Sequence, residues 1–147
     1  MDKKSGHFFV TTPIYYVNDK PHIGHAYTTV MADVFARYHR RIKCKENVFF
    51  LTGADEHGAK VAKSAESRNL SPQEFADIIS EEYKNLWKTL DISYDEFFRT
   101  TDPRHKEVVQ DYLQRLYNSG YIYKAKYKGL YCIGCEKFLP FDEIVIF

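Results

Sequence analysis

Two histidines lie three positions apart where the sequence changes from a loop to a helix. His22 and His25 flank Gly24 in the run His-Ile-Gly-His. A helix N-terminus presents unpaired N–H groups and a partial positive charge, so it favours phosphate. Two imidazoles one turn apart can both donate to phosphate oxygens there, and the glycine lets a flat base or a ligand backbone approach closely. The alternative interpretation is that both histidines are solvated cap residues.

A second group of polar residues follows an apolar run. Asp55, Glu56 and His57 lie in the segment 53–58, directly after the run 47–52. Asp55 could hold a cationic group such as the ammonium of an amino acid. It could equally be a turn-former or helix cap beside a glycine. A metal site is a third hypothesis, in which two histidines and this carboxylate form a two-histidine-one-carboxylate set of His22, His25 and Asp55.

Two cysteines near the C-terminal end have the spacing of half a zinc site. A structural zinc needs four ligands, and Cys132-x-x-Cys135 supplies only two. The remaining cysteine, Cys44, lies far away at a basic helix end. A redox pair is the alternative, although this pair does not lie at a helix start after a strand.

The elements that must position these residues follow from hydrophobic periodicity. Residues 7–12 and 47–52 are short, nearly continuous apolar runs, and helical spacing between them predicts a helix over about 24–41. Strand, helix, strand with apolar strands indicates a parallel βαβ unit. Ligands of such sheets bind beyond the carboxyl ends of the strands, which are followed here by the loops 13–25 and 53–58.

Helices dominate the next part of the chain. One is predicted over about 59–68, one opens at the capping box that begins at Ser71, and one runs from Asp102-Pro103 to a stop at Gly120. After residue 120 the pattern changes to short antiparallel β-structure and the start of a metal knuckle. The sequence therefore predicts two parts, residues 1–120 and 121–147.

Composition limits the class of protein. The chain has 147 residues, 44% of them hydrophobic and 28% charged, with a formal net charge of +1. Neither nucleic acid nor an anionic membrane is indicated by overall charge, and the basic run over 37–45 is typical of a solvated helix end. No apolar run approaches the roughly 20 residues that span a bilayer. Three cysteines make no disulfide framework, so we expect a cytoplasmic protein without a membrane partner.

Taken together, three segments resemble the N-terminal part of the methionyl-tRNA synthetases, which are class I aminoacyl-tRNA synthetases. Residues 10–27 resemble the first strand and HIGH signature, residues 50–58 the second strand and amino-acid-binding loop, and residues 127–136 the start of the zinc-bearing connective domain. HIGH alone also occurs in other class I synthetases and in small nucleotidyltransferases. The combination with the other two segments is specific to methionine enzymes, and the similarity extends to about residue 139.

The resemblance implies an α/β fold. Residues 1–120 would form the N-terminal half of a Rossmann-like, parallel-sheet nucleotide-binding domain, and residues 121–147 the beginning of the connective domain. Ala54 stands where the family often has threonine. The family's KMSKS loop, second zinc knuckle and anticodon-binding domain have no counterpart in this sequence. We therefore expect an N-terminal fragment that by itself has little or no activity.

The resemblance also implies a reaction, in which methionine and ATP, with Mg²⁺, form methionyl-adenylate and the methionyl group passes to tRNA(Met). By this resemblance His22 and His25 donate to the phosphates and Gly24 admits the adenine. Asp55 pairs with the methionine ammonium, and the thioether pocket is lined by Ile14 and Tyr16.

The zinc of the complete family site would need ligands beyond Cys132 and Cys135, so we expect this chain alone not to hold it. Two alternatives remain for the function. One is a ligand-binding remnant without turnover, and the other is a small HIGH-type nucleotidyltransferase.

Overall fold

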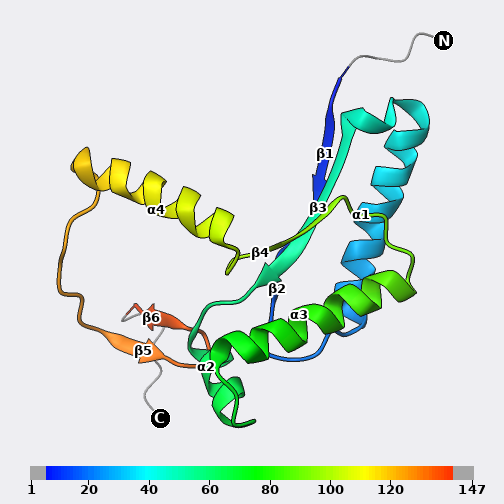
Figure 1. Ribbon diagram of the computed structural model, residues 1–147. Helices are drawn as coiled ribbons and strands as arrows, with labels where there is room; N and C mark the ends of the chain where they lie inside the picture. The colour runs from blue at the N-terminus through cyan, green and yellow to red at the C-terminus, as the bar shows by residue number, and fades with distance from the viewer. Residues whose placement is uncertain (1–5, 141–147) are drawn as a thin grey trace. The chain divides into compact units, whose positions relative to one another are not determined.

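The strand β3 (Val48–Asp55) organises the sheet in the computed structural model, which describes residues 6–140 (Figure 1). β1 (Phe8–Thr11) lies parallel to its first half, from the pair Phe8 and Val48 onward. β4 (Glu96–Arg99) lies parallel on its other side. The two-residue strand β2 (Tyr15–Tyr16) pairs with the end of β3. All pairings in this sheet are parallel, which confirms the predicted α/β class.

The predicted βαβ unit is present. β1 leads through α1 (Ile23–Ile42) and a short 3-10 turn, η1 (Lys45–Asn47), into β3. β3 continues through Asp55, three residues beyond the predicted strand, because β2 and β4 both pair with its last residues. Asp55 is therefore the last residue of a strand rather than a loop residue.

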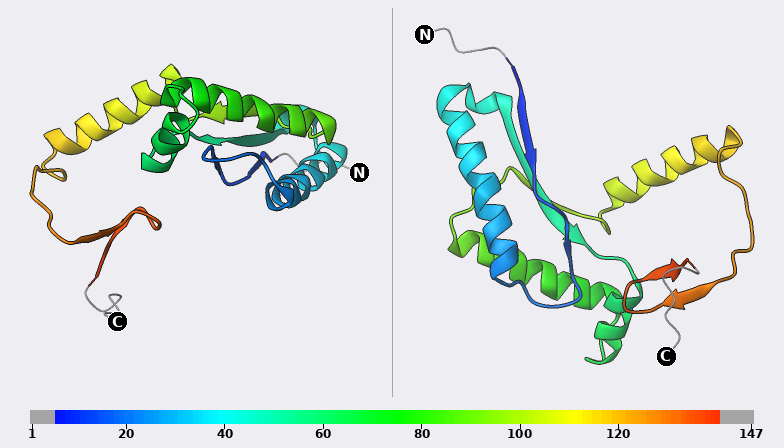
Figure 2. Two further views of the ribbon diagram at one scale, coloured as in Figure 1. Left: turned by 90° about the horizontal axis from the view of Figure 1, so that it is seen from below. Right: turned by 180° about the vertical axis from the view of Figure 1, so that it is seen from behind.

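One face of β3 is buried along its whole length. Val48, Phe50, Thr52 and Ala54 alternate toward this face and are all buried. The first two pack in a cluster with small residues of α1, and Ala54 packs with side chains of α2 (Ala59–Glu66) and α3 (Pro72–Thr89). The views in Figure 2 show α1 beside the β1–β3 pair and α3 beside the end of β3. The core therefore packs α1 against the first half of β3, and α2 and α3 against its end.

Helix ends follow the predicted signals. Ser71 accepts the backbone N–H of Glu74, whose carboxylate accepts the N–H of Ser71 in return. α4 (Pro103–Asn118) ends two residues before Gly120, which has a φ of 78°, a conformation that glycine adopts without steric cost. The capping box and the glycine stop are both confirmed.

The apolar stripe that predicts α1 does not face the sheet. Its large side chains are exposed, with Tyr27 at 69% and Val34 at 59%. The face that packs against β1 and β3 consists of small and polar residues, namely Thr29, Ala32, Asp33 and Ala36. Small residues allow the helix to approach the sheet closely, and the periodicity alone does not reveal which face does so.

A polar network holds the segment before β4 against α1. Asp33 accepts hydrogen bonds from the N–H (2.7 Å) and hydroxyl (2.5 Å) of Ser93 and pairs with Arg37. Asp95 accepts the N–H of Phe50 at 2.7 Å. These contacts tie β4 to β3 although 40 residues separate them in sequence.

By internal contacts the chain divides into two compact units, residues 1–106 and 107–147. The predicted division at residue 120, between a half-domain 1–120 and a connective part 121–147, stays a prediction. In the second unit, β5 (Leu130–Cys132) and β6 (Lys137–Leu139) form an antiparallel pair. Residues 121–127, whose alternating pattern predicts a β-strand, form neither helix nor strand.

Among residues 6–140, no helix combines the length and apolar character that crossing a membrane requires.

Candidate active site

His22 and His25 cap the N-terminus of α1 reciprocally. The backbone N–H of His22 donates to Nδ1 of His25 at 3.1 Å, and the backbone N–H of Gly24 donates to Nδ1 of His22 at 3.1 Å. The two rings stack with centroids 3.8 Å apart. Capping, the alternative interpretation of this motif, is therefore part of the structure.

This capping also sets the proton on each ring. A backbone N–H can only donate, so Nδ1 of both neutral rings is an acceptor and the remaining ring proton lies on Nε2. His22 is exposed and His25 half-buried. The site therefore presents the Nε2–H donors of both rings at the N-terminus of a helix, whose partial positive charge also favours phosphate oxygens.

Two tyrosines surround His25. The ring of Tyr15 meets it edge-on at 4.9 Å and that of Tyr83 at 5.3 Å. The Tyr83 hydroxyl lies 3.3 Å from Nδ1 and 3.4 Å from Nε2 of His25, and burial raises the pKa of Tyr83 to about 12. Burial, followed by electrostatic repulsion from a protonated His22, lowers the pKa of His25 and so favours its neutral form.

Glycine is the only residue type that fits at position 24 without movement of the His22 ring. A Cβ there would lie 3.0 Å from Cε1 and 3.1 Å from Nδ1 of the His22 ring. The glycine was expected to leave room for a ligand. In the structure it also leaves room for the capping imidazole.

The two predicted loops meet at the end of the sheet. Tyr16 lies opposite Asp55 in the β2–β3 register, and the N–H of Val17 donates to the Asp55 carbonyl at 3.1 Å. Ile14 directly precedes β2 and is 51% exposed, and Tyr16 is half-buried. Of the residues expected to bind methionine, Tyr16 and Asp55 are thus brought together by strand pairing.

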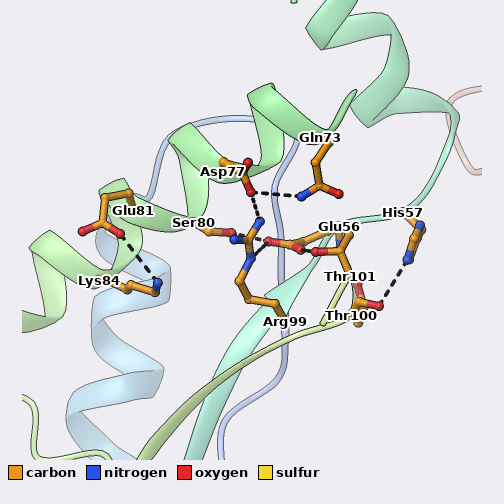
Figure 3. A network of polar contacts seen from close by, with 10 residues as sticks. All are labelled: Glu56, His57, Gln73, Asp77, Ser80, Glu81, Lys84, Arg99, Thr100 and Thr101. Atoms are coloured by element: carbon orange, nitrogen blue, oxygen red, sulfur yellow. Dashed lines mark hydrogen bonds and ion pairs between the residues drawn. The ribbon is translucent and has the colours of Figure 1, made fainter. Parts of the chain in front are cut away.

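The residue after Asp55 is the most constrained acid of the site (Figure 3). The side chain of Glu56 is fully buried, and it pairs with Arg99 at 2.6 Å. Its carboxylate also accepts the hydroxyls of Ser80 (2.5 Å) and Thr101. The ion pairs of the described residues include that of Glu56 but none of Asp55. His57 lies nearby, exposed, with Nε2 3.3 Å from the Thr100 carbonyl oxygen.

The hypothesis of a two-histidine-one-carboxylate metal site is not supported. Among residues 6–140 no group of three histidine, cysteine or acidic side chains is arranged to hold a metal, so His22, His25 and Asp55 do not form such a set. Cys132 ends β5 and Cys135 lies in the turn that leads to β6, and neither is in a disulfide. Hydrogen bonds from Cys135 lower the pKa of the Cys132 thiol, which suits a zinc ligand. Cysteines at this spacing can supply two of the four ligands of a tetrahedral site, which stays a prediction.

Sequence reasoning missed the partners of these residues. β2 and β4 are too short to produce a period-2 pattern, and in the sequence Tyr83 is only one of several apolar residues at helical spacing in α3. Nothing in the local sequence connects Glu56 to Arg99, which is 43 residues away. Only the structure reveals that Glu56, directly beside the predicted ammonium partner Asp55, is buried.

Comparisons of the sequence with a family model and with known proteins agree on one family. The family model described as "tRNA synthetases class I (M)" matches residues 8–146. A methionine–tRNA ligase of Streptomyces coelicolor is 52% identical over 132 residues, which is 89% of this chain and 24% of that protein. A methionine–tRNA ligase of Thermotoga maritima is 51% identical over 138 residues, 94% of this chain and 22% of that protein. The chain thus spans about a quarter of the length of these relatives.

A solved structure shares the fold. Mycobacterium tuberculosis methionyl-tRNA synthetase, in complex with methionyl-adenylate, matches with a TM-score of 0.85 and 38% identity. The match covers 94% of this chain and 27% of that protein.

Proposed function

Because this chain belongs to the class I (M) tRNA synthetase family, we propose that it forms part of a methionine–tRNA ligase and contributes the histidine cluster and the amino-acid pocket to the site. The observation that carries this proposal is the reciprocal cap of His22 and His25, which leaves two Nε2–H donors at a helix N-terminus. Its likeness to a synthetase in complex with methionyl-adenylate supports the same reading.

The reaction we propose begins with methionine activation. A carboxylate oxygen of methionine attacks the α-phosphorus of ATP, the bond to the bridging oxygen breaks, and pyrophosphate leaves with that electron pair. Charge develops on the phosphate oxygens during this displacement. Donors already oriented toward that charge need no reorganisation, which is the main electrostatic contribution an enzyme makes to such a step.

Each residue of the cluster has a role in this proposal. His22 and His25 donate to the phosphates through Nε2, and neutral rings can do so because both Nδ1 atoms already accept backbone N–H groups. The helix N-terminus adds its own partial positive charge. Gly24 carries no Cβ that would block the adenine.

The amino acid would bind at the end of β3. Asp55 pairs with the methionine ammonium as a charge-assisted contact. Ile14 and Tyr16, which precede and form β2, would line the thioether pocket. Because a thioether is only a weak hydrogen-bond acceptor, shape and apolar contact provide most of the selection.

The substrates and partners of the whole enzyme are part of the same proposal. ATP would enter with Mg²⁺, the methionyl group would pass to tRNA(Met), and a family zinc site would take Cys132 and Cys135 as two of its four ligands. We place the reaction in the cytoplasm, which the three cysteines support because none of them is in a disulfide.

Methionine binding provides the most direct test. In calorimetry the chain should bind L-methionine in a 1:1 ratio, and Asp55→Asn should weaken binding by about 1.5–3 kcal/mol, roughly 10- to 100-fold in Kd. N-acetylmethionine, which lacks the ammonium, should bind no better to the wild type than to the variant. Asp111→Asn, on the exposed face of α4, is the matched control and should bind like wild type.

Two further results would separate the alternatives. Because this chain by itself is expected to have little or no activity, only methionine-dependent pyrophosphate exchange above background by this chain would exclude a binding function without turnover. Binding of ATP with no preference for methionine would favour a nucleotidyltransferase. If Asp55→Asn leaves methionine affinity unchanged, the proposed pocket is wrong.

A further inference from the structure

We propose that Glu56 is the positioning residue of the amino-acid pocket, and that its carboxylate, held through Arg99, orients the backbone that carries Asp55 and His57. The inference rests on the proposed function only for the role of Asp55. Its structural basis is the polar network around Glu56 (Figure 3).

Glu56 is held from three directions. The hydroxyl of Ser80 on α3 donates to Oε1 at 2.5 Å, and Arg99 at the end of β4 donates to the same oxygen through Nε at 2.6 Å. The hydroxyl of Thr101 donates to Oε2. A fully buried carboxylate with donors from separate elements has one permitted orientation.

The backbone of the same turn is held as well. The N–H of Glu56 donates to the Thr100 hydroxyl at 2.9 Å, and the N–H of Thr100 donates to the Ala54 carbonyl at 3.3 Å. On the other side, β2 bonds to the Asp55 carbonyl through Val17. The peptide groups flanking Asp55 are therefore fixed by β2 and by the end of β4, and its carboxylate enters none of the ion pairs found within residues 6–140.

Arg99 connects this network to α3. Its Nε binds Glu56, and its Nη2 binds Asp77 at 2.5 Å. The hydrogen bond from the Arg99 guanidinium lowers the pKa of Asp77, and the same cation also holds Glu56. The planar fork of arginine can satisfy two carboxylates in different directions, and a lysine ammonium cannot reproduce that geometry.

These contacts favour a positioning role over one of bulk stability. A buried ion pair contributes little net stability compared with well-packed apolar side chains of the same volume, because the desolvation of both charges is costly. Its hydrogen bonds do, however, impose a single geometry. Here that geometry belongs to the residue next to the proposed ammonium partner.

The test compares two buried acids with similar partners. Glu56→Gln removes the charge at the pocket. Asp33→Asn removes one at α1, where Ser93 and Arg37 are the donors, as serine, threonine and arginine are for Glu56. Methionine affinity is measured by calorimetry, stability by thermal unfolding, and local order by amide hydrogen exchange over residues 54–58.

We expect both variants to lose stability and only Glu56→Gln to lose pocket order. Glu56→Gln should weaken methionine binding at least tenfold and accelerate exchange over residues 54–58, while AMP affinity stays within twofold of wild type. Asp33→Asn should keep wild-type methionine affinity and exchange. If Glu56→Gln does not fold, Arg99→Lys provides the same readouts, with a smaller loss because the cation is retained.

The outcomes distinguish this inference from the proposed function. Unchanged exchange over residues 54–58 in the Glu56→Gln or Arg99→Lys variant would overturn the positioning role, as would an equal loss of methionine affinity in Asp33→Asn. Absence of methionine binding by the wild type would instead overturn the proposed function. The positioning role is then decided by hydrogen exchange alone, where faster exchange confined to the pocket variants supports it.

Discussion

The imidazoles of His22 and His25 form one reciprocal cap, in which the His22 backbone donates to the His25 ring and the two rings stack 3.8 Å apart. The same contacts that cap the start of α1 also determine which ring nitrogen carries the proton. Structure and proposed chemistry are therefore coupled at this point, because a substitution that removes the cap also changes the donors.

Replacement of the capping ring should destabilise α1. We expect His22→Ala to lower the free energy of unfolding by about 0.5–2 kcal/mol, the usual effect of losing an N-cap acceptor, measured by urea unfolding. His22→Asn should recover most of this loss, since an asparagine side chain can accept the Gly24 N–H. Equal stability of the wild-type and Ala proteins would contradict the capping role.

Stability should also depend on the protonation of His25. Its pKa in the folded state is lowered from 6.5, mainly by burial, so below pH 6.5 the unfolded state binds more protons than the folded state. The contribution is fully present above pH 6.5, decreases as the pH falls through 6.5, and levels off below the lowered pKa. Urea unfolding from pH 8 to pH 5 should show this decrease.

The control for the pH experiment is His25→Gln, which cannot titrate. The difference in unfolding free energy between wild type and variant should shrink as the pH falls. A difference that stays constant over this range would show that His25 is not the group responsible.

Gly53 is expected to tolerate no side chain. A Cβ at this position would overlap the backbone carbonyl oxygen of Phe98 in the neighbouring strand β4. Because backbone rather than a flexible side chain is in the way, Gly53→Ala must displace β4 from β3, with a cost of about 1–3 kcal/mol or more. Thermal unfolding would measure it. Gly134→Ala, where the nearest atom is the Cys132 sulfur at 3.8 Å, is a control with little expected effect on unfolding.

Cys132 should react as a thiolate at a lower pH than an ordinary cysteine. Hydrogen bonds from Cys135, first from its backbone, lower the pKa of Cys132. In the Cys44→Ser/Cys135→Ser double variant, the alkylation rate of Cys132 should therefore reach half of its maximum below the pH of about 8.5 that is usual for a cysteine, because the backbone N–H remains. A midpoint at or above the usual value would contradict this prediction.

Much of this protein is determined by local sequence. The His-Ile-Gly-His run marks the start of α1, Ser71 and Glu74 form their capping box, and Gly120 ends α4, because each signal involves residues within a few positions of one another. The apolar runs define β1 and most of β3 in the same way. The combination of the three motif segments also identified the family, which the family match over residues 8–146 confirms.

Tertiary structure decided the features whose partners are distant in sequence. The pairing of Glu56 with Arg99 and of Tyr16 with Asp55 depends on how strands from separate segments meet on β3, and no local pattern encodes that meeting. Tertiary structure also decided which face of α1 is buried. Close packing against the sheet selected its small residues, whereas hydrophobic periodicity pointed to the opposite, exposed face.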